Sequence, residues 1–274
     1  MTEDAIAPTD LAARFGTAAA PILIDVRRQP RFEESDAVIP GSLRRTHDQV
    51  ASWQGSLPRD RDVVVYCVHG LEIGRDAAAE LRAAGVRARF LAGGFDGWRE
   101  GGGAVMAKHA HLTAGKPSEW VTRERPKIDR VACPWLIRRF VDPAAKFHYV
   151  PTEQVFAYAA ETGTIPYDIP GAEPFSHDGE LCSFDTFIRH YAIRDQALDR
   201  LASIVRGADT DRLELTPQSA GLLAIFLGMS ANYGAEDHAM MEAGMTVYDA
   251  LYTWCGKLTA ETHNWNPAAV GAAA

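Results

Sequence analysis

The chain has 274 residues, 47% of them hydrophobic, and a formal net charge of -8 at pH 7, which is enough material for two ordinary domains. The acidic balance disfavours nucleic acid as a partner, because such binding needs clustered Lys and Arg, and no apolar run reaches the roughly 18 residues of a membrane span. The four cysteines show no CxxC spacing and the N-terminus lacks the basic and apolar stretches of a secretory signal, so we expect a cytoplasmic protein that uses neither nucleic acid nor a membrane.

Short apolar runs alternate with a helical pattern in the first third of the chain. Residues 21–26, 63–68 and 86–91 are predicted strands, and residues 75–84 form a predicted helix. Strands that alternate with helices are typical of an α/β domain, in which helices cover both faces of a central parallel sheet. Catalytic groups in such sheets lie at the carboxyl ends of the strands, and Cys67 occupies that kind of position.

A change of pattern near the middle of the chain predicts a second, mainly α-helical domain. A run of three glycines at 101–103 precedes a stretch without apolar periodicity, which we interpret as a linker. The alanine-rich end of the chain is expected to be frayed. The predicted parts are a first domain at 1–107, a linker at 108–118, a helical domain at 119–265 and a flexible tail at 266–274.

Four polar residues in the second half suit the position before a helix, because their side chains can accept hydrogen bonds from the free N–H groups there. They are Thr152, Ser183, Asp195 and Thr216. A further helical pattern covers residues 235–255. The second domain is therefore predicted to be built from at least five helices.

A cysteine stands directly between a predicted strand and a predicted helix at residues 66–75, whose sequence is Tyr-Cys-Val-His-Gly-Leu-Glu-Ile-Gly-Arg. Backbone N–H groups of the loop and the positive end of the helix would converge on the Cys67 sulfur, which favours the thiolate and then a persulfide anion. Gly70 allows the loop to curl tightly enough for those N–H groups to point inward. The predicted active-site loop consists of Cys67, Val68, His69, Gly70, Leu71, Glu72, Ile73 and Arg75.

Residues 10–105 resemble the rhodanese family at several separate motifs. Residues 22–27 are similar to its first core strand ending in Asp-Val-Arg, residues 39–42 to its Ile-Pro-Gly-Ala element, and residues 91–98 to its closing Leu-x-Gly-Gly-x-x-x-Trp signature. The resemblance implies that Cys67 accepts sulfane sulfur from a small donor and passes it to a nucleophilic acceptor, a thiol or cyanide, without a cofactor. Asp25 and Arg27 of the first motif are then expected to support the site.

One position departs from the rhodanese pattern. The family commonly has Arg five residues after the cysteine and Ser or Ala next, whereas this chain has Glu72 and Ile73. A carboxylate there would repel an anionic donor such as thiosulfate and oppose the helix dipole. The expected donor is therefore a persulfide, and Arg75 or His69 is expected to offset the Glu72 charge.

The second domain resembles the C-terminal domain of chromate-resistance proteins of the B type. The resemblance rests on residues 120–140, 169–173, 176–184, 205–209 and 236–238. The resemblance implies a link to chromate or oxidative stress, but it indicates a biological context rather than a particular reaction.

A polar loop of the second domain is a candidate metal site. His177 and Glu180 stand three residues apart in it, and Asp129, Asp209 or His238 could join them to complete a shell of nitrogen and oxygen for zinc, manganese or iron. The alternative is that these residues satisfy buried backbone groups between helices, with Asp129 capping one helix.

Basic residues and two cysteines in the same region also have two interpretations. The basic residues could form a pocket for a tetrahedral oxyanion such as chromate, or they could be solvated or paired with carboxylates. Cys133 and Cys182 could respond to redox changes, but single cysteines between apolar neighbours are more often inert packing. The basic residues are Arg123, Arg125, Lys127, Arg130, Arg138 and Arg139.

Three hypotheses for the function follow. The leading one is a sulfurtransferase that carries sulfur on Cys67, fused to a chromate-resistance domain and acting in chromate or oxidative stress detoxification. The second is a redox or persulfide sensor that signals the state of Cys67 without turnover. The third is a metal-dependent redox enzyme in the helical domain, with the rhodanese module as an accessory.

Overall fold

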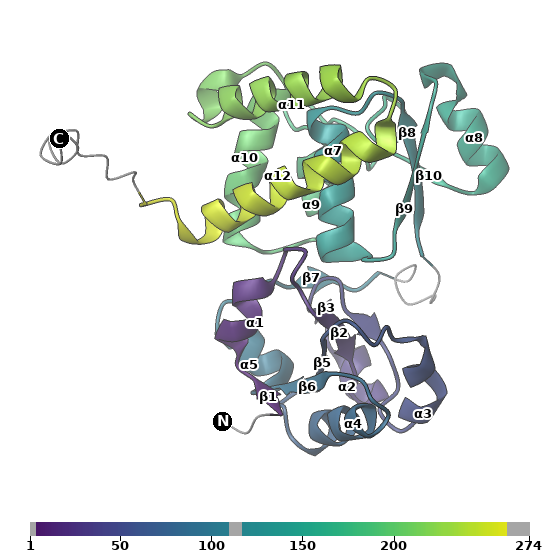
Figure 1. Ribbon diagram of the computed structural model, residues 1–274, viewed down its shortest axis with the longest axis vertical. Helices are drawn as coiled ribbons and strands as arrows, with labels where there is room; N and C mark the ends of the chain where they lie inside the picture. The colour runs from purple at the N-terminus through teal and green to yellow at the C-terminus, as the bar shows by residue number, and fades with distance from the viewer. Residues whose placement is uncertain (1–3, 110–116, 262–274) are drawn as a thin grey trace, which may run out of the picture.

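A computed structural model of the chain describes residues 4–109 and 117–261. Figure 1 shows an α/β domain and a mainly helical domain packed one above the other. Most of the predicted linker and the whole predicted tail at 266–274 lie outside the described residues. The predicted order of an α/β domain followed by a mainly helical one is confirmed.

The first domain is built on a sheet in which, among the described residues, five parallel strands pair in the order β1-β6-β5-β2-β4. A separate antiparallel pair joins β3 to β7. The strands are β1 (Ala5–Ile6), β2 (Ile22–Asp25), β3 (Ala37–Val38), β4 (Leu43–Arg44), β5 (Val63–Tyr66), β6 (Ala88–Leu91) and β7 (Met106–Ala107).

Helices cover both faces of this sheet, as the alternation of strands and helices predicts. Neighbouring strand residues point to opposite faces, so Val64 packs on the side of α1 and α5 whereas Val65 packs on the side of α3 and α4. The helices are α1 (Pro8–Arg14), α2 (Gln29–Glu34), α3 (Val50–Trp53), α4 (Glu72–Ala83) and α5 (Gly94–Glu100).

The second domain is mainly helical, and Asp195 caps α10 as predicted, accepting hydrogen bonds from the N–H groups of Ala197 and Leu198. The helix predicted from Ser183 is in place, with Cys182 at the capping position. No helix within residues 4–109 and 117–261 has the length and apolar character needed to cross a membrane. The helices are α7 (Ile128–Leu136), α8 (Val155–Thr162), α9 (Ser183–His190), α10 (Gln196–Asp209), α11 (Ser219–Tyr233) and α12 (Asp237–Lys257).

The second domain also contains a parallel sheet that the sequence analysis missed. Within the described residues it has three strands in the order β10-β8-β9, namely β8 (Glu119–Arg123), β9 (Lys146–Val150) and β10 (Ile165–Pro166). The strands β8 and β9 begin with a charged residue and β10 has only two residues, so they offer little periodicity from which to predict a sheet. This sheet matters for the site, because Asp168 follows β10 and Asp129 lies in the first turn of α7, the helix that comes after β8.

One hydrophobic core runs through both domains. Phe15, which follows α1, contacts the ring of Trp98 on α5 at a centroid distance of 5.3 Å and that of Phe140 in the second domain at 5.4 Å. Backbone hydrogen bonds reinforce this junction, since Ala107 donates to the carbonyl of Tyr191 over 3.0 Å. Domains that share a core in this way are expected to unfold together rather than independently.

Replacing Phe15 with alanine is expected to lower the free energy of unfolding by about 3–5 kcal/mol, because it removes a ring that packs on both domains. Differential scanning calorimetry of the full chain measures the loss as a lower midpoint of one joint transition. Leu227→Ala is the matched control, because this side chain is 47% exposed and its removal should cost less than about 0.5 kcal/mol. Two separate transitions in the unmodified chain would contradict the shared core.

Candidate functional site

Cys67 lies immediately after β5 and five residues before the start of α4. The helix begins at Glu72, three residues earlier than the sequence predicts, so the loop between strand and helix is short. The cysteine is 5% exposed. Its sulfur faces the first turn of α4, because a Cβ atom added to Gly74 would lie 3.4 Å from the Cys67 Sγ.

The backbone of this loop is held from behind by the N-terminus of α5. The N–H of Phe95 donates to the carbonyl of Cys67 over 2.9 Å, and the N–H of Asp96 donates to the carbonyl of Val68 over 3.0 Å. Because the C=O and N–H of a planar trans peptide point in opposite directions, the N–H groups of Val68 and His69 point away from α5. Within residues 4–109 and 117–261, no protein acceptor takes a hydrogen bond from the N–H groups of residues 68–73. Such a run of free N–H groups beside a thiol can bind an anion.

Two glycines let the loop and the α5 N-terminus come this close. Gly70 has φ +67°, and a Cβ there would lie 2.5 Å from the carbonyl oxygen of Leu91. Gly94 has φ +60°, and a Cβ there would lie 2.5 Å from the backbone nitrogen of Gly70. A side chain at either position would therefore push the two segments apart, which explains Gly70 of the loop and Gly94 of the closing motif in physical terms.

The side chains of the loop point mostly to solvent. His69 is exposed and pairs with Asp96, with 3.1 Å between Nδ1 and Oδ2. The Arg75 guanidinium lies 5.4 Å from the centroid of the Phe90 ring. Glu72 and Leu71 are exposed, and Val68 and Ile73 are half-buried. Among the described residues neither Arg75 nor His69 forms an ion pair with Glu72, so the expectation that one of them offsets its charge has no support in the contacts.

Asp25 and Arg27 form a buried ion pair at the carboxyl end of β2. Both side chains are 1% exposed, and the Nη2 of Arg27 lies 2.6 Å from the Oδ2 of Asp25. Burial raises the pKa of Tyr66, so this phenol remains protonated and donates to Asp25 over 3.1 Å. The Arg27 guanidinium also lies 4.5 Å from the centroid of the Phe95 ring. The Asp25–Arg27 pair therefore supports Phe95, whose N–H holds the Cys67 carbonyl. The pair lies behind the loop rather than beside the Cys67 sulfur.

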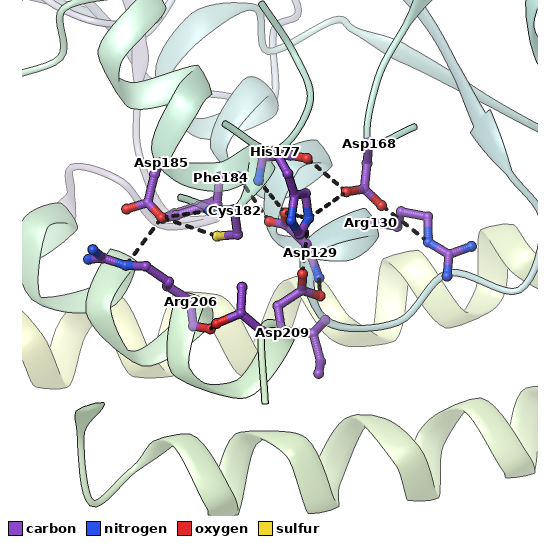
Figure 2. A network of polar contacts seen from close by, with 12 residues as sticks. Asp129, Arg130, Asp168, His177, Cys182, Phe184, Asp185, Arg206 and Asp209 are labelled. Atoms are coloured by element: carbon purple, nitrogen blue, oxygen red, sulfur yellow. Dashed lines mark hydrogen bonds and ion pairs between the residues drawn. The ribbon is translucent and has the colours of Figure 1, made fainter. Parts of the chain in front are cut away.

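A second polar centre lies in the helical domain, where Figure 2 shows His177 surrounded by three carboxylates. The Nε2 of His177 lies 3.2 Å from Asp209, 3.4 Å from Asp168 and 3.6 Å from Asp129. Asp129 is in the first turn of α7, Asp209 is the last residue of α10, and the other two residues lie between β10 and α9. Sequence reasoning selected His177, Asp129 and Asp209 but missed Asp168. The only local signal for Asp168 was its position in a loop directly after a short apolar stretch.

Asp129 also caps α9, as the alternative interpretation predicts. It accepts hydrogen bonds from the N–H groups of Ser183 over 2.6 Å and Phe184 over 3.0 Å. Burial and then the neighbouring carboxylates of Asp209 and Asp168 raise the pKa of Asp129 well above its usual range. Hydrogen bonds to Asp168 and Asp209 raise the pKa of His177 to about 10.

Two of the residues predicted to bind metal lie outside this centre. The Glu180 side chain is 86% exposed and pairs with Arg212 over 3.2 Å. His238, at the start of α12, has its Nε2 2.9 Å from the carbonyl oxygen of Phe147. Glu180 is close to His177 in the sequence and His238 has the chemistry of a metal ligand, but neither side chain reaches the His177 centre.

The basic residues of this region are largely paired with carboxylates. Arg123 and Arg130 both contact Asp168, at 3.2 Å and 3.4 Å. Arg138 pairs with Glu242, and Arg139 pairs with Asp249. The contacts of these four residues thus match the paired interpretation rather than an open oxyanion pocket.

The two cysteines of this region are fully buried. Burial raises the pKa of both Cys133 and Cys182 well above the usual range of a thiol. A protonated thiol without access to solvent is a poor nucleophile, so these environments fit inert packing better than a redox-responsive role.

Comparisons with known proteins match both halves of the chain. Residues 7–101 match the rhodanese-like domain family, and residues 120–255 match the family described as the ChrB C-terminal domain. Thiosulfate sulfurtransferase GlpE of Actinobacillus succinogenes is 34% identical over 82 residues, which cover 30% of this chain and 71% of GlpE. The chain belongs to the rhodanese family and carries a ChrB C-terminal domain.

Protein ChrB of Cupriavidus metallidurans is 31% identical over 136 residues, which cover 49% of this chain and 40% of ChrB. The chain therefore spans less than half of the length of that relative. Among solved structures, a rhodanese-related protein of Thermoplasma volcanium is 27% identical, with a TM-score of 0.33 over 37% of this chain and 95% of that chain. The two family matches confirm the predicted fusion of a rhodanese-like domain to a ChrB C-terminal domain.

Replacing Asp25 with asparagine is expected to destabilise the rhodanese-like domain by about 3–5 kcal/mol, because it leaves the buried Arg27 charge uncompensated. Urea denaturation of the full chain followed by circular dichroism measures this loss. The exposed Asp76 offers a matched Asp→Asn control, whose effect should stay within about 0.5 kcal/mol. Equal effects of the two substitutions would show that the ion pair does not support the fold.

Proposed function

We propose that the chain is a sulfurtransferase that carries sulfane sulfur as a persulfide on Cys67. The observation that supports this most is the run of free N–H groups at residues 68–73, next to a cysteine at the end of a parallel strand. Such groups lower the energy of a negative charge on sulfur, first on the thiolate and then on the outer sulfur of the persulfide.

The proposed reaction has two steps, each of which exchanges one bond to sulfur. The Cys67 thiolate attacks the outer sulfur of the donor, a new S–S bond forms, and the donor leaves with the electron pair of the broken bond. An acceptor, a thiol or cyanide, then attacks the outer sulfur of the persulfide, and Cys67 leaves as a thiolate. The chain needs no cofactor for this chemistry, because it supplies both the nucleophile and the N–H groups that stabilise it.

The donor proposed for this loop is a persulfide rather than thiosulfate. The relative GlpE is named a thiosulfate sulfurtransferase, but Glu72 places a carboxylate at the entrance of α4 beside the loop. A negative side chain there repels a dianionic donor more strongly than a singly charged one. The chemistry is thus shared with sulfurtransferases, while the preferred donor differs.

The proposed context is detoxification in chromate or oxidative stress. The ChrB C-terminal domain supports it, because ChrB shares this domain with the chain. Sulfur transfer fits such a role, since persulfides and thiols are consumed when cells face strong oxidants.

Cys67→Ser is expected to abolish sulfur transfer, because a hydroxyl cannot hold sulfane sulfur. Mass spectrometry of the unmodified chain after incubation with cysteine persulfide should show a gain of about 32 Da on the peptide that contains Cys67. Cys255→Ala, which alters a buried thiol on α12, is the control and should retain both the adduct and turnover. Persistent transfer by Cys67→Ser would refute the proposal, and an adduct without multiple turnover would favour the sensor hypothesis.

Glu72→Arg is expected to raise kcat/KM for thiosulfate by about tenfold, because it replaces repulsion of the dianion by attraction. Steady-state assays with thiosulfate and cyanide measure this change, which should shrink as the salt concentration rises. Glu80→Arg, an exposed charge reversal at the far end of α4, is the matched control and should change the rate far less. Equal responses would show that Glu72 does not face the donor.

A further inference from the structure

Three carboxylates from different parts of the chain converge on one nitrogen of His177 (Figure 2). They come from α7, from the segment after β10 and from the end of α10, so the tertiary fold assembles the group. Asp129 is 1% exposed and Asp168 is 4% exposed. Buried carboxylates are normally paired or bound to a metal, because an isolated buried charge is very costly.

Hydrogen bonding alone explains the geometry around His177 poorly. The Nε2 atom carries at most one hydrogen, and a hydrogen bond between charged groups usually spans about 2.7–2.9 Å. The three distances from Nε2 are 3.2, 3.4 and 3.6 Å. All exceed that range, and one N–H group cannot point at three oxygens.

The same distances fit atoms that share a metal ion. Ligand atoms that each lie about 2.1 Å from a metal are about 3.0 Å apart at right angles, about 3.4 Å apart at tetrahedral angles and about 3.6 Å apart at an angle of about 120°. One ligand atom from each of Asp129, Asp168 and His177 lies within 4.8 Å of the others. We propose that these three residues bind a divalent transition-metal ion, with Asp209 next to His177 completing the site.

The surroundings of the carboxylates suit ligands that are held in place. Ser183 and Phe184 donate backbone N–H groups to Asp129, while the Ser183 hydroxyl donates to Asp168 over 2.7 Å. The second oxygen of Asp168 contacts Arg123 and Arg130. Partners of this kind orient metal ligands in known sites.

The site is also open to solvent on one side. The His177 side chain is 43% exposed, and that of Asp209 is 20% exposed. An ion can therefore enter past these two residues and bind the buried carboxylates behind them. An open side leaves room for water or a substrate oxygen as a further ligand.

The donor atoms indicate which ions the site takes. One imidazole nitrogen with carboxylate oxygens suits zinc, manganese and ferrous iron. Calcium typically takes six to eight oxygen ligands and rarely binds an imidazole. Among the described residues the group whose ligand atoms lie together contains no cysteine, and the nearby Cys133 and Cys182 thiols donate to Asp129 and Asp185 instead.

The test uses the full chain prepared without a polyhistidine tag, stripped with EDTA and then dialysed against Zn²⁺, Mn²⁺ or Ca²⁺. We expect about one Zn²⁺ or Mn²⁺ per chain by elemental analysis, a higher Tm in the presence of that ion, and no uptake of Ca²⁺. His177→Gln should weaken binding of the transition metal at least about tenfold. Because His177 is partly exposed, this variant should keep the fold, which circular dichroism checks.

Two matched variants separate the proposed ligands from other acidic and imidazole groups of the domain. Glu180→Gln and His238→Gln change side chains that lie outside the centre and should bind the ion as the unmodified chain does. Uptake below about one-tenth of an ion per chain for both Zn²⁺ and Mn²⁺ would overturn the proposal. Undiminished binding by a folded His177→Gln variant would overturn it as well.

Discussion

Each domain places an aspartate with almost no exposure at its polar centre, and a buried carboxylate is tolerated only when several donors reach it. Asp25 receives the guanidinium of Arg27 and the phenol of Tyr66. Asp129 receives two N–H groups from the start of α9. Tyr66 lies 41 residues from Asp25, and Ser183 lies 54 residues from Asp129, so both centres are completed only when distant elements adopt their correct positions.

The free amides beside Cys67 depend on the first of these aspartates. The Arg27 guanidinium that pairs with Asp25 also stacks on the Phe95 ring, and the Phe95 N–H holds the Cys67 carbonyl. The Asp25–Arg27 pair thus helps to set the direction of the loop N–H groups through Phe95, although the pair is not beside the sulfur. The same logic applies to His177, whose carboxylate neighbours are oriented by Ser183 and by Arg123 and Arg130.

The rhodanese-like half could be predicted closely from the sequence because its site is local. Strand, loop and helix follow one another within residues 63–83, and each leaves a pattern of apolar residues and glycines. The His177 centre could be predicted only in part. Asp168 is brought to it by β10, a two-residue strand that leaves no periodicity, whereas Glu180 is close to His177 along the chain but turns toward Arg212. The residue types indicate the kind of site, but the packing of distant segments determines which residues belong to it.

The aromatic contacts from Phe15 to Trp98 and Phe140 have a consequence for how any sulfur bound to the chain can travel. Carrier domains on flexible linkers move the group that they carry from one active site to another. Here a hinge motion between the halves would expose rings that are buried at their junction, at a cost of several kcal/mol, on the order of one large side chain. On the proposed function, a hinge between the halves would therefore not carry sulfur on Cys67 from one site to another, and donor and acceptor would each have to reach the loop itself.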